Sequence, residues 1–192
     1  MRTLDPVLQE KRKRQILEAA ERCFEKSGFQ GASIAQLCKE AKISPGHLYH
    51  YFPSKEAIIR DLTGAKLKQA AVFIKELMDD PDPISALVKK MEFTRAKEGL
   101  IFEMLAEAKH NEEIAEILVE HNREIRRLLA EFVSKAQQDG KMDKDLEPDH
   151  AAAILISIID GAKAMAIRDP ELSNTQRKEH LARLISRFLL PE

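Results

Sequence analysis

The chain has 192 residues, enough for one large domain or two small ones, with 44% hydrophobic and 33% charged residues. This composition excludes an intrinsically disordered chain. The apolar run from Ala151 to Ile159 ends at Asp160, too short to span a membrane, and the first residues lack the apolar core of a signal peptide. We therefore expect a cytoplasmic protein without membrane association, in which Cys23 and Cys38 are buried, reduced thiols.

The charge is unevenly distributed, although the net charge is only −1. Up to Arg60, eleven Lys and Arg oppose seven Asp and Glu, a net charge of +4, and the rest of the chain carries −5. This asymmetry indicates an anion-binding surface near the N-terminus. The basic run at residues 11–14 is either an arm that contacts phosphate or the minor groove, or a solvated helix face.

Apolar residues recur at helical spacing in nearly every segment, and no stretch alternates as a strand would. The pattern predicts an all-α fold of about nine helices, in which an N-terminal three-helix unit precedes a C-terminal helical bundle. Gly28 should cap the first helix, a loop should follow at residues 29–32, and Gly99 should separate two helices. The predicted helices are Leu8 to Ser27, a second from Ser33, a third from Ser44 to Phe52, Ser54 to Met78, Asp82 to Ala96, Leu100 to Lys109, Asn111 to Gln138, Pro148 to Ile167, and a last one from Ser173.

Residues 33–52 are the most informative segment, because they predict two short helices joined by a tight turn. Ser33 and Gln36 have the spacing of a capping box, and Ser44 followed by Pro45 is typical of a helix start. This layout is that of a helix-turn-helix, whose second helix enters the major groove of DNA. We therefore expect residues 1–54 to form a DNA-binding domain.

The second helix of this motif carries an unusual set of side chains. Leu48 and Phe52 should point back to the preceding helix, while His47, His50 and Tyr51 should turn outward. Free amides at the helix start attract phosphate, and tyrosines offer hydroxyl groups to phosphate and ring faces to thymine methyls. The alternative is a small three-helix core with exposed aromatic rings, but such rings normally need a reason.

Here the sequence resembles the tetracycline-repressor (TetR) family of bacterial transcription regulators. The resemblance covers roughly residues 10 to 60, and its strongest part runs from Gly46 to Phe52, followed by Ser54-Lys-Glu. Ile16-Leu-Glu-Ala-Ala, Phe24 and Gly28 also match. The resemblance implies an all-helical homodimer, a palindromic DNA operator and, usually, a small-molecule inducer bound by the C-terminal domain, here residues 55–192.

The resemblance also assigns DNA contacts position by position. On the second helix these are Ser33, Ala35 and Gln36. Base-facing positions on the third are Pro45, Gly46, His47 and Tyr49. Phosphate-facing positions are His50, Tyr51 and Lys55.

Two positions depart from the family pattern. Lys42 stands where the family usually has glycine in the turn, and a left-handed conformation there would cost a lysine about 1 kcal/mol. Either the turn differs or Lys42 adds a phosphate contact. Ala35 replaces the base-reading polar residue of some relatives, so specificity should depend on the third helix.

The C-terminal part should supply a dimer interface, because one monomer reads only one half-site. The predicted helix from Ala151 to Ile167 is apolar around most of its circumference and carries small residues that allow close packing. Paired with the last helix, it would form half of an intermolecular four-helix bundle. An ordinary intrachain core is the alternative. The expected interface residues are Ile154, Ile158, Gly161, Ala162, Met165, Leu181, Leu184, Ile185 and Phe188.

A ligand pocket is predicted where polar or soft residues interrupt apolar stripes. For each single residue, a core position is the alternative to a ligand contact. The low aromatic content argues against an aromatic cage for a large cation and favours a mostly apolar inducer. The candidate pocket residues are Met91, Phe93, Phe102, Met104, Glu107, His121, Phe132, Asp160 and Met165.

The function predicted from these observations is that of a DNA-binding repressor, not an enzyme, without a cofactor or metal. A DNA-binding regulator or activator without a ligand is the first alternative. A di-iron helical-bundle enzyme is a remote one, because Glu107 with His110 and Glu147 with His150 have the Glu-x-x-His spacing, with Glu103 and Glu120 as further carboxylates. Glu147 precedes a helix instead of lying within one, which speaks against such a site.

Overall fold

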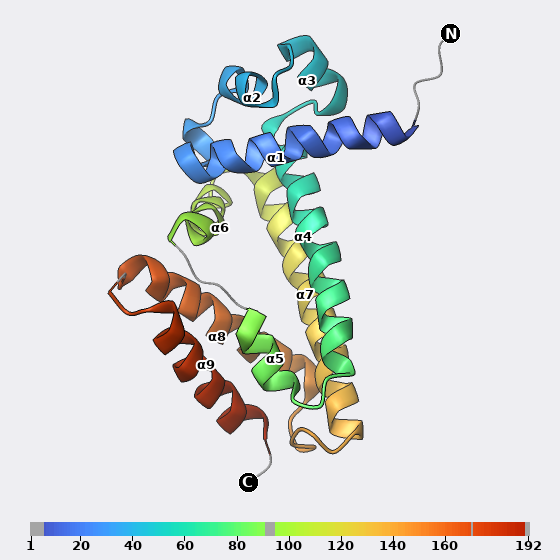
Figure 1. Cartoon of the computed structure of the whole chain (residues 1–192), viewed down its shortest axis with the longest axis vertical. Helices are drawn as coiled ribbons and strands as arrows, with labels where there is room; N and C mark the ends of the chain where they lie inside the picture. The colour runs from blue at the N-terminus through green and yellow to red at the C-terminus, as the bar shows by residue number, and fades with distance from the viewer. Residues whose placement is uncertain (1–5, 91–94, 170, 191–192) are drawn as a thin grey trace. The chain divides into compact units, whose positions relative to one another are not determined.

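The computed structural model describes residues 6–90, 95–169 and 171–190 (Figure 1). These residues form nine α-helices and contain no strand, so the prediction of an all-α fold is confirmed. The helices are α1 (Pro6–Gly31), α2 (Ile34–Ala41), α3 (Pro45–Tyr51), α4 (Lys55–Met78), α5 (Pro83–Lys90), α6 (Arg95–Glu107), α7 (Glu112–Gln138), α8 (Pro148–Arg168) and α9 (Asn174–Leu189).

Side-chain caps fix the starts of the helices where the sequence predicted them. The amide of Gln36 donates to Ser33 Oγ at 3.2 Å, and the amide of Ser33 donates to Gln36 Oε1 at 2.8 Å, which completes the predicted capping box. Ser44 Oγ accepts from the amide of His47 at 3.2 Å, with Pro45 in the first turn of α3. The same kind of cap forms at Ser54, Asp82, Asn111 and Ser173.

Two predicted helix boundaries are wrong. The loop expected at residues 29–32 does not form, because α1 continues to Gly31 after a kink at Gly28. The φ of 72° and ψ of 172° at Gly28 belong to a region that only glycine adopts readily. Gly99 does not separate two helices, since α6 runs through it. A single glycine inside a helix costs only about 1 kcal/mol, which the helix tolerates. Residues 91–94 of the helix predicted from Asp82 to Ala96 lie outside the described residues.

The chain divides into two compact units. Unit 1 comprises Met1–Ala65 and Gly99–Leu118, and unit 2 comprises Lys66–Glu98 and Val119–Glu192. Helices α4 and α7 each contribute residues to both units. The boundary predicted between residues 54 and 55 divides a DNA-binding part from a part for ligand binding and dimerisation. It does not coincide with the division into compact units, and it stays a prediction.

Each unit has its own apolar core. In unit 1 the core joins α1, α2, α3, the first turns of α4 and parts of α6 and α7, and its members include Ile16, Ala20, Phe24, Phe29, Leu37, Leu48, Phe52, Ile58, Ile59, Met104, Ile114 and Ile117. Cys38 also belongs to this core, whereas Cys23 is only half-buried, and burial raises the pKa of both free thiols. In unit 2 the core includes Ile74, Leu77, Leu87, Leu129, Phe132, Val133, Leu155, Leu181, Ile185 and Leu189.

Helix α8 is less buried than its composition would suggest. An 18-residue window in it has a mean hydropathy of 1.5, and only 28% of that window is buried. By length and composition it is long and apolar enough to cross a membrane, contrary to the expectation from Ala151–Ile159. The reason is that small apolar residues continue the run beyond Asp160. A helix that is apolar around most of its circumference is normally buried, so the exposed apolar side chains of α8 indicate a surface that packs against another molecule.

Candidate nucleic-acid interface

Helix α3 is a short helix held from behind by two buried side chains. Leu48 is 0% exposed and Phe52, directly after the helix, is 2% exposed. Both belong to the core of unit 1 together with Leu37 of α2. The predicted inward direction of Leu48 and Phe52 is therefore confirmed. Such bracing leaves the opposite side of α3 free and fixes its orientation.

The free side of α3 carries aromatic and imidazole rings. His47, Tyr49 and His50 are exposed, and Tyr49 keeps 51% of its surface accessible. Tyr51 differs from the prediction, because its ring is half-buried and packs against the core of unit 1. The ring centroid of Tyr51 lies 5.5 Å from that of His47 and 5.3 Å from that of His50. Tyr51 thus supports both imidazoles from the side, and Tyr49 offers the most open ring.

The start of α3 and the start of α2 are both accessible. Ser33, Ala35 and Gln36 are exposed, as are Pro45 and Gly46. A Cβ built on Gly46 would meet nothing within 4 Å, so another molecule can approach this backbone closely. Free amides at a helix start are suited to bind phosphate. These residues are arranged as DNA contacts require, and the contacts themselves stay predictions.

Lys42 resolves the departure noted in the turn. Its φ of 55° and ψ of 47° are left-handed, and its amide donates to the carbonyls of Cys38 and Lys39. The turn therefore keeps the geometry that glycine usually provides, at an energetic cost to a lysine. The Lys42 side chain is exposed, which leaves its predicted phosphate contact possible in space.

Lys55 binds backbone carbonyls near the end of α1, a contact that the sequence did not predict. Its Nζ donates to the carbonyl of Phe29 at 2.9 Å and to that of Ala32 at 3.3 Å. The same ammonium lies 4.6 Å from the centroid of the Phe29 ring. Because an ammonium has three donors, one remains for the predicted phosphate contact.

The basic run at residues 11–14 is only partly available to DNA. Lys13 forms an ion pair with Asp61 and lies 5.7 Å from the centroid of the Phe52 ring. Arg12 donates to the side chain of Gln15 at 2.9 Å. Lys11 and Arg14 are exposed, so the predicted basic arm reduces mainly to these two side chains.

The predicted ligand-pocket residues are divided between the two compact units. Met91 and Phe93 lie outside the described residues. In unit 1, Met104 is buried in the core, and Phe102 and Glu107 are half-buried. The members in unit 2 are His121, Phe132, Asp160 and Met165. Phe132 is core, with 1% of its surface exposed.

His121 and Asp160 do interact, together with two lysines that the sequence analysis missed. Burial lowers the pKa of His121, the ammonium groups of Lys163 and Lys66 lower it further, and Asp160 opposes them. Lys163 Nζ donates to Asp160 Oδ1 at 2.9 Å. Among the described residues, the buried Nδ1 of His121 has no hydrogen-bond partner. Such an atom lowers stability unless another molecule satisfies it.

The predicted interface residues divide into a buried and an exposed set. Ile185 is 0% exposed, and Ala162 and Leu181 are largely buried within unit 2, so the intrachain alternative describes these three. The exposed apolar residues are Ile154 (44%), Met165 (39%) and Leu184 (52%). Ile158 and Phe188 are half-buried, and Gly161 is exposed. We call Ile154, Ile158, Gly161, Met165, Leu184 and Phe188 the α8/α9 face.

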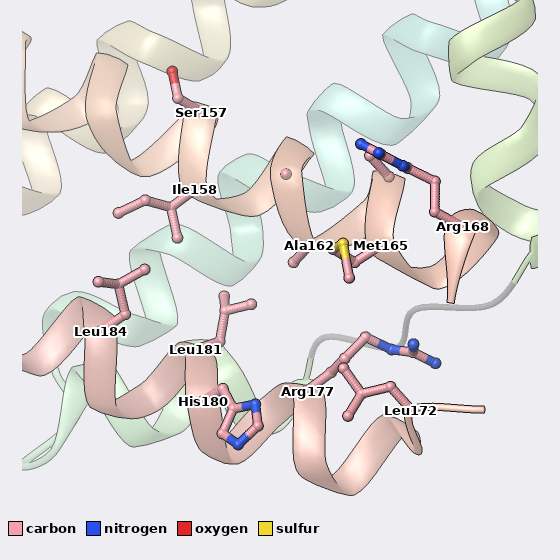
Figure 2. A pocket seen from close by; sticks show the side chains of 12 residues that line it. Ser157, Ile158, Ala162, Met165, Arg168, Leu172, Arg177, His180, Leu181 and Leu184 are labelled. Atoms are coloured by element: carbon pink, nitrogen blue, oxygen red, sulfur yellow. The ribbon is translucent and has the colours of Figure 1, made fainter. Parts of the chain in front are cut away.

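A groove of about 600 Å³ runs along part of this face (Figure 2). Figure 2 shows Ile158, Ala162 and Met165 of α8 on one side, and Leu181 and Leu184 of α9 on the other. Arg168, Arg177 and His180 also line it. A Cβ built on Gly161 would meet nothing within 4 Å, so a partner helix can approach α8 closely there.

The di-iron arrangement is not supported by the structure. Glu107 and His110 belong to unit 1, whereas Glu147 and His150 belong to unit 2. Glu147 Oε2 accepts the amide of His150 at 2.7 Å and thereby caps α8. In the part of the chain that the structure describes, no group of three or more His, Cys, Asp or Glu is arranged to hold a metal ion.

Sequence comparison assigns both parts of the chain to families of regulators. Residues 16–62 match bacterial regulatory proteins of the tetR family, and residues 84–190 match the C-terminal domain of BetI-type transcriptional repressors. The transcriptional regulator UidR of Escherichia coli strain K12 is 30% identical over 153 residues, which cover 78% of each chain. The regulator PksA of Bacillus subtilis strain 168 is 26% identical over 181 residues, covering 88% of this chain and 84% of PksA.

Solved structures give the same result for the fold. GusR of Salmonella enterica superposes with a TM-score of 0.78 at 25% identity, over 98% of this chain and 99% of GusR. A regulator from Saccharomonospora viridis, solved in complex with choline, reaches a TM-score of 0.78 at 21% identity, over 95% of this chain and 100% of that one. At 21% identity the second comparison concerns the fold alone.

Proposed function

Because this chain belongs to the TetR family of bacterial transcriptional regulators, we propose that it is a repressor that binds a palindromic operator as a homodimer and is released by a small molecule. It acts in the cytoplasm, where it competes with transcription at a promoter. The matched families and the named relatives are regulators and not enzymes. The observation that carries the proposal is helix α3, which buried Leu48 and Phe52 fix to the core while the rings of His47, Tyr49 and His50 stay exposed.

DNA reading is assigned to α3, with support from α2. The exposed rings of His47 and Tyr49 combine apolar faces with polar atoms, which suits the methyl groups and acceptors of base edges. Buried Leu48 and Phe52 hold this surface rigid, and rigidity lowers the entropic cost of binding. The open starts of α2 and α3 supply amides to phosphate. Lys42, His50, Tyr51 and Lys55 would add backbone contacts that set the register of the protein on the duplex.

Dimerisation is assigned to the α8/α9 face. Two reading helices must lie about 34–36 Å apart to enter successive major grooves, which requires a two-fold partner. Ile154, Met165 and Leu184 would be covered by the same residues of a second copy, because a two-fold interface uses one patch twice. The small residue at Gly161 lets the two copies of α8 approach closely.

Release is assigned to a ligand bound in the C-terminal part of the chain. The polar group at His121, with Asp160 and Lys163, would orient an otherwise mostly apolar ligand. Helix α4 contributes to both compact units, so a ligand-dependent tilt of α4 would move α3 out of register with the grooves. By linkage, the operator must weaken ligand binding by the same factor that the ligand weakens operator binding, on the order of 1–3 kcal/mol.

The test uses the full-length dimer and the DNA upstream of its own gene. A mobility-shift titration should give a retarded complex, and in vitro transcription from that promoter should fall as the complex forms. A metabolite panel is then screened by isothermal titration, with release of the operator as the second readout. Absence of specific binding to any duplex would overturn the proposal. Binding without any releasing ligand would reduce it to ligand-independent regulation, and increased transcription would make the protein an activator.

A further inference from the structure

Phe29, which follows the kink at Gly28 near the end of α1, has both its backbone amide and its backbone carbonyl bound by side chains of later helices. The amide of Phe29 donates to Glu103 Oε2 of α6 at 2.8 Å. The carbonyl of the same residue accepts from Lys55 Nζ of α4 at 2.9 Å. Both partners belong to unit 1, although Glu103 lies 74 residues further along the chain. The backbone of Phe29 is therefore fixed by an acidic side chain at its amide and a basic side chain at its carbonyl.

The backbone around Phe29 is shaped to receive the Glu103 carboxylate. Gly28 has a positive φ of 72° and ends the regular part of α1. A Cβ on residue 28 would overlap the carboxylate at the flexible end of the Glu103 side chain. Glycine at this position therefore provides the conformational freedom that the positive φ requires and lets the carboxylate stay beside the backbone.

The Phe29 amide needs this acceptor. Phe29 is 2% exposed, its ring lies 5.7 Å from that of Phe24, and Ala32 beside it is 0% exposed. The backbone of such a buried segment is normally satisfied, and a buried donor without a partner costs about 1–3 kcal/mol. The turn after Gly28 has a backbone bond of its own, from the Ala32 amide to the Gly28 carbonyl at 3.1 Å.

Glu103 does not contribute to the packing of α6. Its side chain is exposed apart from the carboxylate contact, whereas the next residue, Met104, is 3% exposed and lies in the core of unit 1. Packing and hydrogen bonding are thus performed by two different residues of the same helix. A substitution at Glu103 can remove the hydrogen bond without opening a cavity.

We propose that Glu103 is a positioning residue for operator binding. It acts through the Phe29 amide, which lies four residues before Ser33, the cap of α2 and itself a candidate phosphate contact. By holding the end of α1 at Phe29, Glu103 sets the orientation of α2 relative to α1 and ties α6 to the DNA-reading helices. This inference rests on the proposed operator binding.

The experiment compares Glu103→Gln with Glu103→Met in the full-length protein. Both variants remove the negative charge and have similar length, but only Gln keeps an oxygen acceptor. We expect the Gln variant to bind the operator with nearly the affinity of wild type and the Met variant to bind about tenfold more weakly, because the buried amide loses its partner. Hydrogen exchange at the Phe29 amide should accelerate in the Met variant and not in the Gln variant.

Further measurements separate positioning from other effects. The salt dependence of operator affinity should be the same in wild type and both variants, since Glu103 contacts no phosphate in this account. Glu116→Met, on the exposed side of α7 in unit 1, is the control for charge removal and should bind like wild type. If the Met variant fails to fold, Glu103→Asp keeps the charge but shortens the reach, and it should show the same loss.

Equal operator affinity and equal Phe29 exchange in the Gln, Met and Asp variants would overturn the inference. Failure of wild type itself to bind any operator would instead overturn the proposed function and is recognised before any variant is compared.

Discussion

Two surfaces of this molecule leave rings or apolar side chains exposed, and they differ in chemistry. On α3 the exposed side chains of His47, Tyr49 and His50 carry polar atoms at the end of each ring. On the α8/α9 face the exposed groups are aliphatic or thioether, with Leu184 at 52% exposure. Rings with polar ends suit a wet, hydrogen-bonding partner, whereas aliphatic surface suits a dry interface. The difference indicates DNA for the first surface and a second copy of the chain for the second.

The largest effect on assembly and operator affinity is expected when a charge is placed on the α8/α9 face. Leu184→Glu should convert the dimer into monomers at micromolar concentration and lower operator affinity by roughly a hundredfold or more, because an unpaired carboxylate would be buried in the interface. Analytical ultracentrifugation and mobility shift measure the two effects. Val119→Glu introduces the same charge at a similarly exposed position, 56%, and should change neither. A dimer that survives Leu184→Glu would locate the interface elsewhere.

Substitutions on the polar surface should separate DNA binding from assembly. Tyr49→Ala and His47→Ala are each expected to reduce operator affinity toward that for unrelated DNA, by roughly 1–3 kcal/mol per lost base contact, while the dimer persists. Tyr49→Phe removes only the hydroxyl group and shows whether the ring or the hydrogen bond carries the contact. Wild-type affinity in both alanine variants, measured by fluorescence anisotropy, would refute the assignment.

Lys55 tests whether one side chain serves both the fold and the DNA. Lys55→Met should weaken binding to all sequences alike and reduce the slope of log affinity against log salt by about 1, because one phosphate contact is lost. It should also lower stability, since the carbonyls of Phe29 and Ala32 lose their donor. A lower melting temperature with an unchanged salt slope would assign Lys55 to the fold alone.

The turn between α2 and α3 should become more stable when its strain is removed. Lys42→Gly is expected to raise the free energy of unfolding by about 1 kcal/mol, because glycine adopts the left-handed conformation at φ 55° without a Cβ penalty. Lys39→Gly, in the right-handed last turn of α2, should instead lower it by about 1 kcal/mol. Urea unfolding measures the free energy of unfolding of both variants. A Lys42→Gly variant less stable than wild type would contradict the claim that Lys42 is strained.

The smallest effect concerns the pH dependence of stability in unit 2. Because burial and two lysines lower the pKa of His121 in the folded chain below 6.5, the unfolded chain binds a proton more readily as the pH falls. The free energy of unfolding should therefore decrease as the pH falls from 6.5 to the lower pKa of His121 in the folded chain. Below that folded-state pKa, His121 is protonated in both states, and its contribution should no longer change with pH. His121→Gln should remove this part of the slope in urea unfolding between about pH 5 and 8. An identical slope in wild type and variant would contradict the shift.

The sequence predicted those features that depend on neighbouring residues. The caps at Ser33 and Ser44 are formed by side chains three residues or fewer from their partners, so local spacing was sufficient. The buried position of Leu48 followed from helical periodicity. The exposure of His47 followed from the same periodicity, and that of Tyr49 agrees with the base-facing position that the family resemblance gave it. The half-buried ring of Tyr51 did not follow from periodicity, because contacts with the core and the two imidazoles outweigh it.

Features that depend on distant residues had no signal in the sequence. The contact of Glu103 with the Phe29 amide joins residues 74 positions apart, and Glu103 was noticed only as a possible iron ligand. Lys55 was expected to face phosphate, but its carbonyl partners, Phe29 and Ala32, lie 26 and 23 residues earlier, at the end of α1 and just after it. Gly28 was predicted to end the first helix, yet α1 continues for a turn after a kink there, where Phe29 is buried. Lys66 and Lys163 beside His121 were missed for the same reason.

Selection from a pool of random duplexes tests most directly whether two α3 helices read DNA as a two-fold pair. The full-length protein is incubated with the pool, bound duplexes are amplified over several rounds, and the enriched sequences are aligned. The account predicts an inverted repeat whose half-site centres lie about one helical turn of 10–10.5 base pairs apart, or a multiple of it, with an even number of protomers bound. Enrichment of a single, unrepeated site bound by one protomer, or no enrichment at all, would contradict it.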